Sequence, residues 1–380
     1  MVNNQQYDFI IVGNGLSGLQ LALEFSKRSF FDNKQIALID KDEKTTNDKT
    51  WSFWEKGDGK WDAIIEKSWQ QASIFAENQR LTLDLKPYTY KSIHSLAFYT
   101  HAKERLRRHE NIHFIIDEIE AIDEGQDLKV IGKGQAYSAG HVFDSRIPEA
   151  YFDDHQFTKI IQHFKGIVIE TPTEVFNPER FTMMDYRIKD GQQTTFTYVL
   201  PYSGKRALVE FTYFTSETVE TSVYDNFIRQ YIKNILKIET YEIVDMEQGQ
   251  IPMSDFPFHR HSTKNITKIG TGGGWVKGST GYSFKHSEKK ARQIADNLVA
   301  DKSPTSGLFK KRFQFYDRIF LKVLKDENHL GEWIFKQFYA KNKVETMFRF
   351  LDEESSFTEE LSIMGSLFSW AFIKAFFKTL

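Results

Sequence analysis

The chain has 380 residues, with 52 acidic and 50 basic side chains, so its formal net charge at pH 7 is −2. This balance provides no basic surface for nucleic acid. Cysteine is absent, which excludes disulfides, thiolate nucleophiles and cysteine-ligated metals. No stretch has the roughly 18–20 apolar residues that span a bilayer, and MVNNQQYDF does not resemble a secretory signal. We therefore expect a cytoplasmic protein with at most a peripheral membrane attachment.

The sequence begins with the pattern of a dinucleotide-binding unit. The apolar run FIIV at 9–12 predicts a parallel strand that is covered on both faces. In the GxGxxG pattern that follows, Gly13 allows a tight turn, Gly15 lets the backbone approach a pyrophosphate, and Gly18 permits close packing of a helix on the strand. The N-terminus of that helix offers free N–H groups and a partial positive charge to phosphates.

A second predicted strand, QIALID, ends at Asp40, where a carboxylate can accept hydrogen bonds from a ribose diol. The alternative is that Asp40 merely caps a turn. Another glycine-rich loop, IGTGGG, occurs late in the chain, where flavoproteins place such a loop against the flavin. Its glycines are Gly270, Gly272, Gly273 and Gly274. Because there is one GxGxxG pattern, NAD(P)H would lack a Rossmann domain of its own, and we predict bound FAD.

The order of strand and helix patterns predicts four segments. Residues 1–150 form the first part of the FAD-binding domain, and 151–260 form an antiparallel substrate-binding sheet with one covering helix. Residues 261–300 return to the FAD-binding domain, and 301–380 are helical. The predicted fold class is α/β: a Rossmann-type FAD-binding domain with an inserted antiparallel β-sheet substrate domain and C-terminal helices.

Six motifs occur in an order that resembles the lycopene β-cyclases of the bacterial and plant type. The motifs are IIVGNGLSGLQLA, KTWSFW at 49–54, NPERFTMMDYR at 177–187, LVEFTYF at 208–214, IPMSDFPF at 251–258 and IGTGGGWVKGSTGYSF at 269–284. TWSFW and the glycine–tryptophan loop are specific to this family, whereas many flavoenzymes share the N-terminal pattern. The resemblance covers roughly residues 7 to 290, and the C-terminal helices more loosely.

The resemblance implies a reaction with no net redox change, in which reduced FAD is required but not consumed and NAD(P)H serves as the reductant. A carboxylic acid protonates the terminal double bond of lycopene or a related linear carotenoid. The internal double bond attacks the carbocation, and proton loss gives a β-ionone ring, so that lycopene becomes γ-carotene and then β-carotene. Since the substrate resides in bilayers, we expect the protein at the inner face of the cell membrane.

Glu210 is the predicted acid. Alternation along RALVEFTYF places it on one face of a strand together with Leu208, Thr212 and Phe214. An apolar cavity disfavours the charged carboxylate, so the pKa should rise, and a neutral glutamic acid can protonate an alkene. Glu210 also matches the required glutamate of the family motif. The alternative is an edge-strand residue that points into water.

Asp185 and Arg187 are a second catalytic candidate, since Asp185 could place negative charge near a developing cation. The alternative is an ion pair within a strand. Aromatic faces stabilise a carbocation without trapping it, or they form ordinary core. The candidate substrate-binding aromatic residues are Trp51, Phe53, Trp54, Trp275 and Tyr282. The HRH run at 259–261 lacks the spacing and carboxylate partners of a metal site, so we assign no metal.

The apolar C-terminal segment, LSIMGSLFSWAFIKAFFKTL, is either an interfacial helix or a buried one. Three other functions stay open for the whole chain. They are a flavin monooxygenase or epoxidase acting on an isoprenoid, a geranylgeranyl-type reductase, and a carotenoid carrier with structural FAD. A monooxygenase would require oxygen, a reductase would consume NADPH stoichiometrically, and a carrier would bind pigment without converting it.

Overall fold

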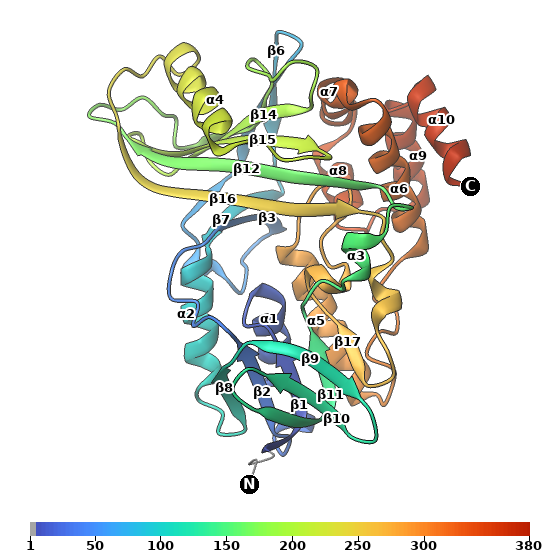
Figure 1. The fold of residues 1–380 in the computed structure, drawn as a ribbon. Helices are drawn as coiled ribbons and strands as arrows, with labels where there is room; N and C mark the ends of the chain where they lie inside the picture. The colour runs from blue at the N-terminus through green and yellow to red at the C-terminus, as the bar shows by residue number, and fades with distance from the viewer. Residues whose placement is uncertain (1–4) are drawn as a thin grey trace.

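The computed structural model describes residues 5–380. Its N-terminal sheet is built around β1 (Gln5–Val12), which pairs in parallel with β2 (Ile36–Asp40) and with β11 (Ala136–Asp144). β8 (Ile112–Ile116) continues the sheet beyond β2, and β17 (Ile266–Lys268) pairs in parallel with β11. The chain therefore returns to this sheet late in the sequence, as predicted (Figure 1).

Three helices cover one face of the N-terminal sheet. These are α1 (Leu16–Phe25), α2 (Ser95–Leu106) and α5 (Phe284–Val299), and their apolar side chains form one buried cluster with those of β1, β2 and β11. An antiparallel pair, β9 (Ile119–Glu124) and β10 (Leu128–Gly132), extends the sheet beyond β11. This is the predicted Rossmann-type α/β arrangement, with both faces of β1 buried.

A second sheet, which like the first has seven strands, crosses the other half of the molecule in the order β16-β12-β15-β14-β13-β5-β6 (Figure 1). All neighbouring strands are antiparallel except β13 and β5. In chain order the strands are β5 (Gln71–Ala76), β6 (Gln79–Asp84), β12 (Lys159–Glu170), β13 (Arg180–Asp185), β14 (Thr195–Pro201), β15 (Arg206–Thr215) and β16 (Glu242–Ser254). The second sheet therefore takes strands from both sides of residue 151.

A small sheet of β3 (Thr50–Lys56), β7 (Tyr88–His94) and β4 (Lys67–Trp69) lies between the two large sheets (Figure 1). Its strands pair antiparallel. β3 carries the TWSFW motif, so this motif lies between the two halves of the molecule.

The two faces of the second sheet have different partners. α4 (Thr221–Asn234) covers one face and packs on alternate residues of β12 and β15. The C-terminal helices contact the opposite face, where their side chains join the largest apolar cluster. They are α6 (Lys311–Asp326), α7 (Gly331–Lys341), α8 (Val344–Leu351) and α9 (Phe357–Ser366), whereas α10 (Trp370–Thr379) packs against α6. Within residues 5–380, none of the helices has the length and apolarity required to cross a bilayer.

We expect Ile228→Ala in α4 to lower the free energy of unfolding by about 2–5 kcal/mol, because this side chain is buried between α4 and the sheet. Lys233→Ala, on the exposed side of the same helix, should change it by less than about 0.5 kcal/mol. Urea unfolding measures both values. Equal destabilisation by the two substitutions would contradict the packing described for α4.

Candidate active site

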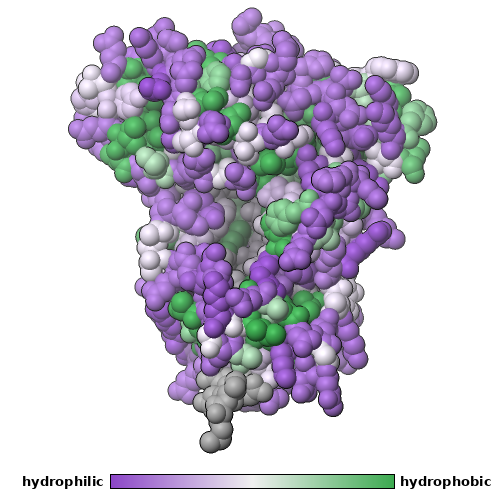
Figure 2. All heavy atoms as spheres, viewed as in Figure 1, coloured by the Kyte–Doolittle hydropathy of each residue, from purple (hydrophilic) through white to green (hydrophobic). Residues whose placement is uncertain are grey.

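A cavity of about 550 Å³ lies between the N-terminal sheet and the second sheet. Its outer end is lined by the two glycine-rich loops and by Asp40, and its inner end by the second sheet and α7. Figure 2 shows the molecular surface hollowed between the two halves of the molecule. The cavity therefore joins a polar, glycine-rich region to an apolar one.

The three N-terminal glycines have different surroundings. Gly13 has φ +106°, and a Cβ there would lie 2.2 Å from Oγ of Ser145. A Cβ at Gly18 would lie 2.0 Å from the carbonyl oxygen of Gly13, so this glycine sets the distance between α1 and β1. A Cβ at Gly15 would meet nothing within 4 Å, because Gly15 borders open space in the cavity. Gly13 and Gly18 thus permit the turn and the helix packing, and Gly15 leaves space at the helix N-terminus.

The N-terminus of α1 faces this open space. Its N-cap is Gly15, which provides no side-chain cap, and its first turn holds no acidic residue. Asp40 lines the cavity while its carboxylate accepts backbone N–H bonds from Asn14 at 2.6 Å and from Asp42 at 2.9 Å. Asp40 thus caps a turn and also faces the cavity. This arrangement fits FAD: the uncapped N–H groups and the free space at Gly15 suit the pyrophosphate, and the carboxylate of Asp40 suits the ribose.

The second glycine loop contributes differently along its length. Gly270 lines the cavity beside α1, whereas Gly272, Gly273 and Gly274 are not among the lining residues. A Cβ at Gly272 would lie 2.2 Å from the carbonyl oxygen of Arg146, and one at Gly273 would lie 2.3 Å from that of Lys268. Gly272 therefore permits close packing of the loop against the segment after β11, and Gly273 permits it against the end of β17.

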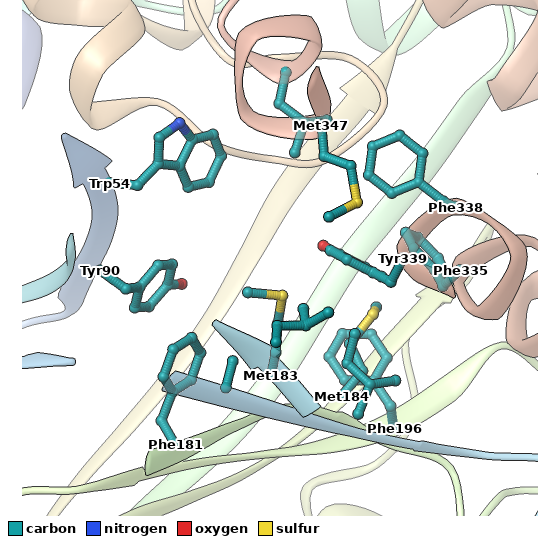
Figure 3. Close-up of a cluster of buried hydrophobic side chains, with 14 of the residues drawn as sticks. Trp54, Tyr90, Phe181, Met183, Met184, Phe196, Phe335, Phe338, Tyr339 and Met347 are labelled. Atoms are coloured by element: carbon teal, nitrogen blue, oxygen red, sulfur yellow. The ribbon is translucent and has the colours of Figure 1, made fainter. Parts of the chain in front are cut away.

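The inner end of the cavity is apolar. Its lining side chains come from β13, β14, β15 and α7, and Figure 3 shows most of them converging from the sheet and the helices. They are Met183, Met184, Phe196, Phe214, Phe335 and Tyr339. Sulfur-containing and aromatic side chains of this kind form an adaptable wall for a hydrocarbon.

Three tyrosine hydroxyls meet between the two ends of the cavity. The hydroxyl of Tyr90 lies 2.9 Å from that of Tyr198 and 3.2 Å from that of Tyr282, and Tyr198 donates to Oγ of Ser52 at 3.0 Å. Burial raises the pKa of all three phenols well above the usual value, so they are neutral. The three hydroxyls are thus held in hydrogen bonds to one another and to Ser52.

Glu210 on β15 lines the cavity and is 8% exposed. It shares its face with Leu208 and Phe214, which belong to the cavity-side cluster, whereas Val209 and Phe211 pack on the α4 side. Burial, followed by the charge of Glu247, raises the pKa of Glu210, and the hydrogen bond from Thr212 opposes this. Glu210 is thus a buried carboxyl group whose neutral form is favoured, as the alternation predicts.

Sequence reasoning missed Glu247, which lies on β16 in contact with Glu210. β16 is an edge strand whose sequence places polar residues on both faces, so the alternation of residue types gives no signal that separates Glu247 from its neighbours. The signal that could have identified it is the pairing of β15 and β16 on either side of β12, which requires the sheet order.

The structure places Asp185 and Arg187 away from the residues that line the cavity. Asp185 is fully buried and binds Arg187, and it accepts a hydrogen bond from the hydroxyl of Tyr231 on α4 at 2.7 Å. An irregular register between Thr182 and Asp185 turns the end of β13, so that Met184 faces the cavity and Asp185 faces α4. The observed contacts of this pair are those that hold α4 on the sheet.

The five aromatic candidates divide into two groups. Trp51, Trp275 and Tyr282 line the cavity. Phe53 and Trp54 lie behind the lining: Phe53 stacks on Phe284 with 4.6 Å between ring centroids, and Trp54 stacks on Phe348 and donates to Asp352 at 3.0 Å. Trp54 still supports the wall, because its ring meets that of Tyr282 edge to face. Among residues 5–380, no group of three His, Asp or Glu side chains is arranged to hold a metal ion.

The glycine loops, the parallel sheet and the cavity define a flavoprotein-like α/β fold. A match to the family described as lycopene cyclase protein spans residues 8–376, so the chain belongs to the lycopene cyclase family. This confirms the resemblance drawn from the six motifs.

Individual relatives are distant. The chloroplastic neoxanthin synthase of Solanum lycopersicum is 21% identical over 83% of this chain, and the chain spans 65% of the length of that protein. A geranylgeranyl bacteriochlorophyll reductase-like protein from Thermoplasma acidophilum has TM-score 0.65 and 12% identity over the whole of both chains. A flavoprotein/dehydrogenase from Cytophaga hutchinsonii has TM-score 0.60 and 10% identity over 95% of this chain and 100% of that one. These structural likenesses show the fold alone.

Gly15→Val tests the assignment of the glycine loop. Its Cβ meets no protein atom, so we expect the fold to persist with a loss of no more than about 1–2 kcal/mol at the helix cap. The affinity for FAD should fall at least about tenfold, because the side chain fills the space for the pyrophosphate. Flavin fluorescence titration measures the affinity. Gly365→Val, also in open space but in α9, is the matched control and should bind FAD normally. Normal binding by Gly15→Val would contradict the assignment.

Proposed function

We propose that this protein is a lycopene cyclase that converts the ψ-ends of lycopene into β-ionone rings by acid-initiated cyclisation. One observation carries the proposal: Glu210, a buried carboxyl group with a raised pKa, opens onto a cavity with an apolar inner wall. Membership of the lycopene cyclase family supports a carotenoid as the substrate of this acid.

In the proposed reaction the O–H bond of Glu210 breaks, and a C–H bond forms at the terminal double bond of the polyene. The internal double bond then closes the ring, and a ring carbon loses a proton, so that protons balance and no electrons are exchanged. An alkene is a weak base, and a neutral carboxylic acid in a water-poor cavity is matched to this task. Asp185 and Arg187 act indirectly in this proposal, by fixing the sheet that carries Glu210.

The cation formed in this way needs neighbours that do not capture it. Trp51, Trp275 and Tyr282 line the cavity and offer aromatic faces, which attract a cation and form no bond with it. The tyrosine hydroxyls are bonded to one another, which reduces their availability as nucleophiles. The apolar wall excludes water, which would otherwise convert the cation into an alcohol.

FAD is the cofactor in this proposal, and NAD(P)H is its reductant. The residues that would hold FAD are Gly13, Gly15, Gly18, Asp40 and Gly270. Gly272, Gly273 and Gly274 would act indirectly, because they allow the second glycine loop to pack closely on its neighbours. Reduced, anionic FAD would supply negative charge beside the developing cation. We propose that 1–150 and 261–300 mainly bind FAD, that 151–260 forms the wall against the carotenoid, and that 301–380 closes the inner end.

The test of the function is an anaerobic incubation of the protein with lycopene in liposomes, FAD and limiting NADPH. The proposal expects more rings than molecules of NADPH, because the reductant is not consumed in the cyclisation. Absolute dependence on oxygen would instead assign a monooxygenase, and one NADPH for each double bond lost would assign a reductase. Pigment binding without conversion would assign a carrier.

Glu210→Gln should abolish ring formation, with a loss of at least about 100-fold in rate, because the amide cannot donate the proton. Carotenoid binding should persist, since glutamine keeps the shape of the wall. Pigment chromatography measures conversion, and quenching of tryptophan fluorescence measures binding. The matched control is Glu217→Gln, an exposed position just after β15, which should convert lycopene at the normal rate. Normal conversion by Glu210→Gln would show that Glu210 is not the acid.

The pH dependence follows from the direction of the pKa shift. Burial raises the pKa of Glu210, so the acid form persists well above the ordinary value for glutamate of about 4.3. As the pH rises through the raised pKa the carboxyl group ionises, and the initial rate of conversion should fall. A rate that instead increases steadily from neutral to alkaline pH would show that a base, rather than this acid, starts the reaction.

We also propose peripheral membrane association through α10, at the inner face of the cell membrane. Ala375 of α10 is buried against α6, whereas Trp370 and Phe377 are 77% and 70% exposed. Figure 2 shows apolar side chains gathered at this corner of the molecule, and Lys374 lies on the same helix. An amphipathic helix with exposed aromatic residues and lysine is typical of attachment to a bilayer surface.

The double substitution Trp370→Ser and Phe377→Ser should lower liposome binding at least about tenfold, because it removes most of the exposed aromatic surface of α10. Co-sedimentation with anionic liposomes measures the change. Phe152→Ser is the control, since Phe152 is 63% exposed on a different part of the chain. Binding that is unchanged in the folded double variant would refute this attachment.

A further inference from the structure

Gly166 separates two carboxyl groups on neighbouring strands. On β12, it pairs in register with Glu210 of β15 on one side and with Glu247 of β16 on the other. Directly opposite residues in an antiparallel sheet point to the same face, so both glutamates extend over the glycine. A Cβ at Gly166 would lie 3.3 Å from Cβ of Glu210 and 3.4 Å from Cγ of Glu247. Because glycine has no side chain, the two carboxyl groups can meet across β12.

The surroundings of the two carboxyl groups differ. Glu210 lines the cavity, whereas Glu247 lies behind it and is bonded by both the side chain and the backbone N–H of Thr50. Donated hydrogen bonds stabilise a carboxylate, so Thr50 favours the charged form at Glu247. The hydroxyl of Thr212 is the donor to Glu210. The cavity-facing group is therefore the better site for a proton, and the rear group the better site for a negative charge.

Several other titratable groups face the pair. Asp245 lies on the same strand as Glu247, and its charge further raises the pKa of Glu247. Tyr198 on β14, Tyr282 in the loop before α5 and Tyr202 after β14 interact electrostatically with one glutamate or the other. Burial raises the pKa of each of these phenols, so none adds a charge near the pair at neutral pH. The negative charges that act on Glu210 and Glu247 are therefore carboxylates.

We propose that Glu210 and Glu247 hold one proton between them across Gly166, and that Glu247 is the positioning residue that keeps this proton on Glu210. Two carboxylates in contact in a desolvated site repel each other strongly, and a shared proton removes that repulsion. In support, burial and mutual interaction raise the pKa of Glu210, and burial raises that of Glu247. The geometry of the sheet supports the shared proton, whereas the role of this proton in ring closure rests on the proposed function.

During cyclisation the pair would act in two directions. The O–H bond of Glu210 breaks as the C–H bond forms on the polyene, which leaves two adjacent carboxylates. Their repulsion makes the pair a stronger base than a single glutamate. When the ring carbon releases its proton, a C–H bond breaks and the O–H bond of the pair forms again. The pair thus returns to its starting state with no external acid or base.

Infrared spectroscopy of the full-length protein tests the pair without any turnover. The carbonyl band of the protonated carboxyl group is identified by its loss in Glu210→Gln and is followed as the pH increases. In the wild type, this band should persist above the ordinary range for glutamate. In Glu247→Gln it should disappear at a pH lower by at least about one unit, or tenfold in proton affinity, because the neighbouring charge has gone. Glu242→Gln, an exposed glutamate on the same strand, should titrate as the wild type does.

Thr50→Val is a second variant, which leaves both carboxyl groups in place. It removes a hydroxyl that stabilises the charge on Glu247, so the band should persist to higher pH than in the wild type. Opposite shifts in the two variants would support the shared proton, and a merely structural role of Glu247 would produce neither. An unchanged titration in folded Glu247→Gln or in folded Thr50→Val would overturn the proposal of a shared proton.

The same protein samples separate this inference from the proposed function. Lycopene conversion by the wild type reports on the function alone. If the two variants show the titration shifts but the wild type converts no lycopene, the shared proton is supported and the proposed cyclase function is refuted. If the wild type converts lycopene but Glu247→Gln shows no titration shift, the proposed cyclase function is supported and the shared proton is refuted.

Discussion

The interaction on which this structure depends is the desolvation of one carboxyl group. Glu210 projects from an interior strand of a seven-stranded sheet into a cavity whose inner wall is made of methionine, phenylalanine and tyrosine side chains. Water is the best solvent for a carboxylate, and its removal favours the neutral acid. The rest of the chain can be understood as what holds this group in place. α4 and the Asp185–Arg187 pair fix one face of the sheet, and the C-terminal helices close the other.

The N-terminal sheet supplies the second half of the cavity. Its glycines leave backbone N–H groups uncovered at the N-terminus of α1, while the small sheet that contains TWSFW spans the distance to the second sheet. The cavity therefore has one end suited to a charged dinucleotide and another suited to a hydrocarbon. In the proposed cyclisation, this arrangement would bring FAD and a polyene to the same acid while it keeps water away from both.

Local patterns in the sequence were sufficient to predict the Rossmann-type unit, because its turn, helix and strands follow one another along the chain. The face of Glu210 was also predictable, since β15 has regular alternation. The face of Asp185 was not predictable in this way. The irregular register of β13 reverses the faces of its last residues, and alternation cannot reveal such a shift. The addition of β5 and β6 to the second sheet, and the contact of Glu247 with Glu210, depend on strand order. Strand order is set by packing across long separations in sequence, for which a single sequence carries little signal.

The most direct test of the central claim is to follow solvent hydrogen into the product. If a protein carboxyl group starts ring closure, lycopene that is cyclised by an excess of protein equilibrated in deuterated water should gain one deuterium at each new ring, at the carbon that began as the terminal alkene, because the proton that the acid first delivers is then a solvent deuteron. Mass spectrometry of the extracted carotenoid would show this. Rings that form in deuterated water with no deuterium gained at that carbon would mean that the reaction does not begin with protonation, and the account of the buried acid would be wrong.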